Sequence, residues 1–261
     1  MIRFEEVQKS FGQLHVLRGV NLEIEDGHTT AIIGGSGCGK SVLLKHIIGL
    51  LHPDEGHVYV NDVDVTRLDV RGLNEVRKKI SMVFQNSALF DSLNIGDNLA
   101  LGLRRHTRLN EMVIREKVKK ALSLVNLDGI EKKFPAELSG GMRKRAAIAR
   151  AVITDPEVIL YDEPTTGLDP PRADRINQLI IDLNKQLGVT SIVVTHDMHS
   201  VYRVAKSVAM LDGTIRFYGT PDELAKCSEP SVLEFLESAR GHEWLNVAPT
   251  TEGDSYHATM E

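Results

Sequence analysis

The chain has 261 residues, of which 42% are hydrophobic and 26% charged, and its formal net charge is −5. This apolar fraction suffices for a sizeable core and excludes bulk disorder, while the mildly acidic balance argues against a protein that coats DNA. The sequence has no apolar run of about 18 residues and no signal-peptide pattern at its start, so we expect no membrane span. Two cysteines, Cys38 and Cys227, cannot form a disulfide framework, which is typical of a reducing compartment.

The first part of the chain alternates short strands with one glycine-rich loop. Alternating apolar residues predict strands over 2–8 and 16–25, and the β-branched run 29–33 predicts a buried strand. A glycine cluster and a helical pattern follow this third strand directly. Further strands are predicted over 57–61 and 79–84.

Helical periodicity dominates from about 87 to 155, most clearly over 110–127 and 140–154. The elements expected after it are a strand over 157–162, a helix over 171–187, a strand over 189–194, two short strands within 206–218 and two short helices within 221–239. Buried strands separated by helices predict an α/β core with a parallel sheet, into which the helical stretch is inserted. We therefore expect one domain over 1–240 and a polar tail over 241–261.

A phosphate-binding loop is predicted where the sequence matches G-x-x-x-x-G-K-[ST]. Glycine permits the positive φ angles that let backbone N–H groups wrap a phosphate chain, and the next helix adds partial positive charge. Lys40 is expected to reach the ATP phosphates and the Ser41 hydroxyl to ligate Mg²⁺. A chance match is disfavoured because a predicted strand precedes the loop and a helix follows it. The expected nucleotide-binding residues are Gly34, Gly35, Ser36, Gly37, Cys38, Gly39, Lys40, Ser41 and Val42.

Two acids, Asp162 and Glu163, end the apolar strand predicted over 157–162. Asp162 is expected to hold Mg²⁺ through water, and Glu163 to orient and polarise the attacking water as a general base. The alternative is a strand that ends in a solvated turn, where acids are common. Pairing with the glycine loop favours the catalytic interpretation.

The segment Leu138-Ser139-Gly140-Gly141-Met142 resembles the signature sequence of the ABC ATPases. Further motifs of that family are present in the usual order. Gln85 matches the Q-loop, Asp169 in Gly167-Leu168-Asp169 the D-loop, His196 in VVTHD the switch histidine, and Phe11 the aromatic residue that stacks on adenine. The resemblance covers about residues 1–235.

The resemblance implies an ABC nucleotide-binding domain: a P-loop NTPase (RecA-like) α/β core with an antiparallel β subdomain and an inserted α-helical subdomain. It implies two copies arranged head to tail, so that Ser139, Gly140 and Gly141 of one copy contact the ATP held by the other. The implied catalytic residues are Glu163, His196 and Gln85, the implied metal-binding residues are Ser41, Gln85 and Asp162, and Phe11 and Asp169 join the nucleotide-binding set.

Four segments are similar to the ATPase subunit of Mla-type phospholipid transporters and to related Mce-associated and chloroplast lipid-import ATPases: GGSGCGKSVLLKHIIGL, FQNSALFDSLNIGDNLA, LSGGMRKRAAIARA and YDEPTTGLDP. Met142 and Val42 depart from the commoner ABC pattern. The likeness implies an ATPase at the cytoplasmic face of the inner membrane that drives a separate MlaE-like permease, with MCE-domain and STAS-domain partners and no nucleic acid. The alternatives are an ABC ATPase for another solute and a mechanotransmission ATPase that moves no substrate.

Several residues keep a second interpretation. Taken alone, Phe11 would be a core side chain and His196 a structural or surface histidine, and Cys38 is either an oxidation-sensitive thiol or a tolerated small residue, of which we favour the latter. The run Arg143-Lys144-Arg145 is interpreted mainly as the solvated face of a helix.

Two segments are candidates for contact with other proteins. Leu89, Phe90 and Leu93 either present an apolar surface to a short coupling helix of the permease or pack the helical insertion onto the core. The tail from Gly241, with Trp244, is either disordered or docks onto the second copy or an accessory protein.

Overall fold

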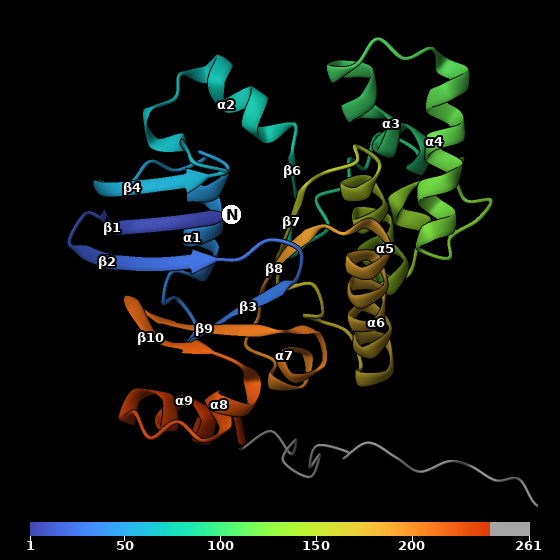
Figure 1. Ribbon diagram of the computed structural model, residues 1–261. Coiled ribbons are helices and arrows are strands. Elements are labelled where there is room, and N and C mark those ends of the chain that lie inside the picture. Colours follow the sequence, from blue (N-terminus) through green and yellow to red (C-terminus); the bar gives the residue numbers. More distant parts are fainter. Residues whose placement is uncertain (241–261) are drawn as a thin grey trace, which may run out of the picture.

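A computed structural model describes residues 1–240, and its two sheets form separate layers of the molecule (Figure 1). The strands are β1 (Ile2–Phe11), β2 (Leu14–Ile24), β3 (Thr29–Ile33), β4 (Glu55–Val60), β5 (Val63–Asp64), β6 (Ile80–Val83), β7 (Val158–Asp162), β8 (Thr190–Val194), β9 (Ser207–Asp212) and β10 (Thr214–Gly219). A four-stranded antiparallel sheet has the order β2-β1-β4-β5, and a six-stranded sheet has the order β10-β9-β3-β8-β7-β6.

The helices cover both faces of the six-stranded sheet. They are α1 (Lys40–Ile47), η1 (Val65–Arg67), α2 (Val70–Arg77), α3 (Ile95–His106), α4 (Glu111–Leu124), η2 (Pro135–Glu137), α5 (Gly140–Val152), α6 (Pro170–Leu187), α7 (Met198–Val204), α8 (Pro221–Ala225) and α9 (Pro230–Arg240). In Figure 1, α3 to α6 stand on one side of this sheet, and α1 with the four-stranded sheet lies on the other. The expected α/β architecture is confirmed.

The central strands of the six-stranded sheet are parallel, and β3, β7 and β8 are buried along their whole length. Strands covered on both faces read as continuous apolar runs, which is why the sequence predicted them. Because β3, β6, β7 and β8 run in the same direction, their carboxyl ends meet at one edge of the sheet. The loops that follow these strands form the candidate site.

The core consists of three clusters of buried side chains. One joins α3, α4, α5 and α6 to β7 and β8, a second fills the space between the four-stranded sheet, α1 and β3, and a third lies under α7, α8 and α9. Side-chain caps start several helices: Asn94 accepts the Asp97 N–H at α3, and Asp69 accepts the Gly72 N–H at α2. The helix α2 was not predicted, since it is short and Leu73 is the only buried residue among its eight.

Within residues 1–240, none of the helices is long and apolar enough to cross a bilayer. The predicted tail over 241–261, including Trp244, lies outside the described residues.

Candidate active site

The loop between β3 and α1 has a shape that only glycine permits at two positions. Gly34 has φ 148°, and a Cβ there would lie 2.2 Å from the Leu211 carbonyl oxygen. Gly39 has φ 106°, and its Cβ would lie 2.8 Å from Cγ1 of Val16. These contacts would force any larger residue to displace the loop. The glycines of the motif therefore hold the loop tightly against the end of the sheet.

Lys40 places its ammonium group inside this loop. Its Nζ donates hydrogen bonds to the carbonyl oxygens of Gly34 and Gly35, both at 2.9 Å, and the side chain is buried. The positive charge thus lies at the amino end of α1, where free backbone N–H groups also favour an anion. The loop presents a preformed phosphate-binding surface.

Ser41 and Asp162 connect the loop to the carboxyl end of β7. The Ser41 hydroxyl donates a hydrogen bond of 2.8 Å to Oδ1 of Asp162. A hydroxyl and a carboxylate oxygen are the kind of donor that Mg²⁺ prefers, and here both point at one spot beside the phosphate loop. The residues present therefore fit a Mg²⁺ ion bound together with a nucleotide.

Glu163 is held in one orientation by two neighbours. His196 Nδ1 lies 2.8 Å from its Oε1, and the Thr166 hydroxyl donates to its Oε2 at 2.9 Å. The backbone N–H of Glu163 donates to the Val194 carbonyl, so the turn after β7 is bound to the end of β8. The Glu163 side chain is only 12% exposed, whereas that of His196 is 64% exposed. The carboxylate is thus fixed, while the imidazole remains open to a ligand.

A cavity of about 690 Å³ brings these groups together. It is lined by Gly34, Gly35, Ser36, Gly37, Gly39, Lys40, Ser41, Val42, Gln85, Glu163, His196, Phe235, Ser238 and Ala239. The last three belong to α9 and were not expected at the site. No sequence signal could have found them, because α9 reaches the cavity only through the packing of Val232 and Phe235 in the third core cluster.

Other expected residues lie outside this cavity. Ser139 is an exposed N-cap at the start of α5, where it accepts the Met142 N–H, and Gly140 and Gly141 begin that helix. Asp169 caps α6 and forms an ion pair with Arg172. These residues lie at the surface and do not reach the phosphate loop of their own chain.

Phe11, at the end of β1, is 46% exposed, so its interpretation as a core side chain is wrong. Its ring lies 5.7 Å from Nζ of Lys9 and does not line the cavity.

The charged residues Arg143, Lys144 and Arg145 near the start of α5 are not all exposed, contrary to the expected solvated face. Arg143 is exposed, but Lys144 is buried and donates hydrogen bonds to the carbonyl oxygens of Gln85 and Glu163. Arg145 is half-buried and donates to the carbonyls of Val125 and Asn126. The interpretation of this run as a solvated face is therefore wrong for Lys144, since successive helix residues point in directions about 100° apart.

Cys38 is half-buried in the phosphate loop, with its Sγ 4.0 Å from Nζ of Lys40. Burial raises the pKa of this thiol, and the nearby Lys40 charge only partly opposes that effect. A raised pKa disfavours the reactive thiolate. The structure thus favours the tolerated small residue over the oxidation-sensitive thiol.

The loop after Gln85 is fixed by the buried side chain of Asn98. Its amide accepts the Phe90 N–H at 2.8 Å and donates to the carbonyls of Phe90, Leu93 and Asn94 at 3.0 Å. Leu89 and Leu93 are half-buried, and Leu89 packs against the helical core cluster. Phe90 is 52% exposed, so the packing alternative does not apply to its side chain.

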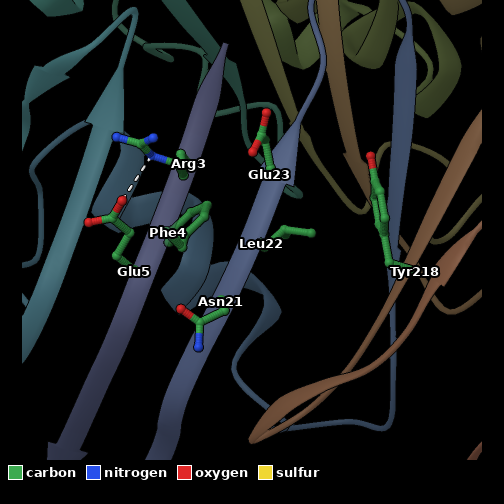
Figure 2. A pocket seen from close by; sticks show the side chains of 7 residues that line it. All are labelled: Arg3, Phe4, Glu5, Asn21, Leu22, Glu23 and Tyr218. Carbon is green, nitrogen blue, oxygen red and sulfur yellow. Dashed lines mark ion pairs between the residues drawn. The ribbon is translucent and has the colours of Figure 1, made fainter.

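A separate shallow cleft of about 340 Å³ lies between β1, β2 and β10 (Figure 2). Arg3 and Glu5 form an ion pair at its wall, and the Arg3 guanidinium also lies 4.6 Å from the centroid of the Tyr59 ring. Tyr218 of β10 faces it from the other sheet. Its lining shares no residue with the phosphate-loop cavity, and its main cation is already paired.

A glycine loop, two carboxylates and a histidine at the carboxyl edge of a parallel sheet define a P-loop nucleoside triphosphatase. The family model described as ABC transporter matches residues 17–166. The chain is 42% identical over 240 residues to the probable ribonucleotide transport ATP-binding protein mkl of Mycobacterium leprae, covering 92% of this chain and 69% of that protein. It is also 42% identical over 227 residues to the intermembrane phospholipid transport system ATP-binding protein MlaF of Haemophilus influenzae, covering 87% of this chain and 86% of that protein.

The fold agrees with these sequence relationships. The dimeric, post-hydrolysis structure of the ATP-binding cassette MJ0796, bound to ADP and phosphate, superimposes with a TM-score of 0.78 at 33% identity, covering 85% of this chain and 99% of that one. The chain belongs to the ABC transporter family and is an ATP-binding, ATP-hydrolysing subunit that powers a transporter. Cassettes of this family form dimers and act with membrane permeases.

Proposed function

We propose that two copies of this chain hydrolyse ATP at shared sites and thereby drive a separate permease that moves phospholipids between membranes. The observation that carries the hydrolytic part is the convergence of Lys40, Ser41, Glu163 and His196 on one cavity, with Asp162 hydrogen-bonded to Ser41 beside it. Each group required for phosphoryl transfer to water is present there: a phosphate cradle, metal ligands and an oriented base.

In this proposal, the loop from Gly34 to Val42 cradles the phosphates of ATP, and Lys40 turns from the loop carbonyls toward them. Ser41, Asp162 and Gln85 would hold Mg²⁺, which would supply charge neutralisation on the phosphate oxygens. The exposed Phe11 ring stacks on the adenine, where its large apolar face is available.

Hydrolysis depends on Glu163. Its carboxylate orients the attacking water and accepts a proton from it while the bond from the γ-phosphorus to the bridging oxygen breaks, giving ADP and phosphate. Thr166 and His196 keep the carboxylate in place, and the exposed His196 ring also reaches the γ-phosphate. Because Glu163 is largely buried, few other waters compete for it.

The second copy completes each site. Ser139, Gly140 and Gly141 lie at the surface, outside their own cavity, and they start a helix of 13 residues. The amino end of this helix suits the γ-phosphate of an ATP held by the facing copy. Asp169, at the start of α6, lies on the same composite interface.

The proposed domain is 1–240, with a helical subdomain over about 87–155 that contacts the permease, and 241–261 is a tail. The four segments similar to Mla-type ATPases and the relationship to MlaF support phospholipid as the cargo. We therefore propose an MlaE-like permease, MCE-domain and STAS-domain partners, a position at the cytoplasmic face of the inner membrane, and no nucleic-acid partner. The equal identity to the mkl protein, named for ribonucleotide transport, favours another solute as the second candidate.

Affinity purification of the tagged full chain from detergent-solubilised native membranes distinguishes these candidates. Protein and lipid mass spectrometry should find a multispanning permease, an MCE-domain protein and bound phospholipid. A permease with a soluble solute-binding protein would replace the lipid assignment by the second candidate. A partner with few membrane spans and a large external domain would instead indicate a mechanotransmission ATPase.

A further inference from the structure

Lys144 is a buried cation with no role in the proposed binding or hydrolysis of ATP. It lies in the second turn of α5, and only 7% of its surface is exposed. Burying an ammonium group is costly unless hydrogen bonds and nearby negative charge compensate it. Burial lowers the pKa of Lys144, and the carboxylates of Glu163 and Asp162 oppose that effect. The hydrogen-bond acceptors of the buried ammonium group must therefore compensate the cost of its burial.

The ammonium group joins three elements at one point. Its Nζ donates to the Gln85 carbonyl at 2.5 Å and to the Glu163 carbonyl at 3.2 Å. Gln85 follows β6, Glu163 follows β7, and Lys144 itself belongs to the helix that begins after Ser139. Glu163 has φ 49°, a conformation that a non-glycine residue keeps only when its surroundings hold it. Lys144 is one of the groups that hold it.

A second cation of α5, Arg150, also binds backbone carbonyls but does not contact Glu163 as Lys144 does. Arg150 donates to the carbonyls of Ser87 and Ala88, so it fixes the loop that follows Gln85. It has no hydrogen bond to Glu163 among the described contacts. The loop is thus bound to α5 at two points, whereas Glu163 is bound to α5 through Lys144.

We propose that Lys144 is a positioning residue for ATP hydrolysis. It fixes the positions of Glu163 and Gln85 relative to α5, the helix that carries the signature residues. The inference rests on the proposed roles of Glu163 and Gln85. Since Ser139 to Gly141 are proposed to contact the ATP of the second copy, a shift of α5 caused by that contact reaches the hydrolytic groups of its own chain through Lys144. The residue thereby connects the two ATP sites of a dimer.

Substitution of Lys144 in the purified permease complex tests the proposal. Lys144→Met keeps the length of the side chain but removes charge and donors, so kcat should fall roughly tenfold to a hundredfold while KM for ATP stays within about twofold. Lys144→Arg keeps the charge and donors and should recover most of the loss. The kcat of Lys144→Gln, which keeps a polar N–H donor, should lie between those of the other two variants. This variant replaces Lys144→Met in the test if the methionine variant does not fold.

Arg145→Gln is the matched control. It removes a cation and two backbone hydrogen bonds from the same helix without touching Gln85 or Glu163. Its kcat should remain within about twofold of the parent, even where thermal unfolding shows a loss of stability. A parental kcat in the Lys144 variants, or the same loss in Arg145→Gln, would overturn the positioning role.

A double substitution shows whether Lys144 acts through Glu163. In a Glu163→Gln chain, Lys144→Met should lower the residual rate far less than in the parent, because groups that act as a unit are not additive. Fully multiplicative losses would contradict the proposal. If Glu163→Gln itself hydrolyses ATP at the parental rate, the proposed function fails instead; if only the Lys144 variants retain that rate, the further inference alone fails.

Discussion

Glu163 combines two features that a surface carboxylate does not need. Its backbone has φ 49°, which costs about 1–3 kcal/mol for a non-glycine residue. Both of its carboxylate oxygens are also bound, one beside His196 and one by the Thr166 hydroxyl. A fixed carboxylate in a strained turn, open to the cavity, has the geometry of a general base.

Glu163→Gln should therefore lower kcat for ATP by about 10²–10⁴-fold, because the amide keeps the shape but cannot accept the proton. ATP should still bind, and the ATP-bound dimer should accumulate. Steady-state kinetics and size-exclusion chromatography with ATP measure both effects. Glu157→Gln, just before the amino end of β7 where Glu157 pairs with Lys79, is the control and should leave kcat unchanged. A parental rate in Glu163→Gln would remove this residue from the proposed role.

The residues of the site differ in how well the sequence could predict them. The phosphate loop and the two acids at the end of β7 follow from local patterns, since a strand, a glycine loop and a helix are contiguous in the chain. The position of Phe235 depends on how α9 packs, which no local pattern encodes. Lys144 was misinterpreted because its charged neighbours suggested a solvated face, whereas its own direction on α5 is inward.

At the scale of elements, α1 contains a buried titratable side chain that makes stability depend on pH. His46 Nδ1 donates to the Val42 carbonyl at 2.7 Å, and its Nε2 has no hydrogen-bond partner within residues 1–240. Burial lowers the pKa of His46 below its usual value of 6.5. The unfolded chain thus binds more protons than the folded chain in acid, so this contribution to stability is present above pH 6.5 and is lost as the pH falls below it.

Urea unfolding at several pH values checks this expectation. The midpoint should fall between pH 7.5 and pH 5.5, values that bracket the usual histidine pKa of about 6.5. His46→Gln should flatten this decrease, because glutamine does not titrate. His52→Gln, a nearby histidine that is exposed, is the control. An equally steep pH dependence in His46→Gln and the parent would contradict the assignment.

In the loop between Gln85 and α3, Asn98 of α3 fixes the backbone of Phe90, whereas the Phe90 side chain is exposed. Phe90→Ala should keep the loop conformation, because Asn98 binds backbone atoms of Phe90 and not its ring. Under the proposed function, ATP binding should be unchanged while co-purification with the permease falls severalfold. Leu187→Ala, at the far end of α6 and also exposed, is the control and should co-purify like the parent. A loss of ATP binding or of folding in Phe90→Ala would show that the ring supports the core instead.

The secondary structure of the elements was largely predictable because each buried strand of the parallel sheet is a short, continuous apolar run bounded by turn residues. The helices α4, α5 and α6 carry an apolar stripe that the sequence also shows. The arrangement of the two sheets was not predictable in this way. It depends on contacts between segments far apart in the chain, such as the hydrogen bond from the Arg18 N–H in β2 to the Gly213 carbonyl between β9 and β10.

In the whole molecule, one copy does not bring all of the predicted site residues together in one cavity. The phosphate loop, Glu163 and His196 share a cavity, while Ser139, Gly140 and Gly141 lie outside it. The family forms dimers, and the dimeric cassette MJ0796 has the same fold as this chain. The proposed division of each site between two copies would account for the exposed start of α5.

Mixing two inactive variants shows whether each ATP site is built from both copies. Lys40→Ala removes the phosphate-loop cation, and Ser139→Arg blocks the start of α5; each variant alone should lose nearly all ATP hydrolysis in the permease complex. When both are co-expressed, a mixed dimer joins the intact phosphate loop of one chain to the intact signature residues of the other, so hydrolysis should reappear. If the mixture stays as inactive as the separate variants, the signature residues serve their own chain, and the two-copy site is wrong.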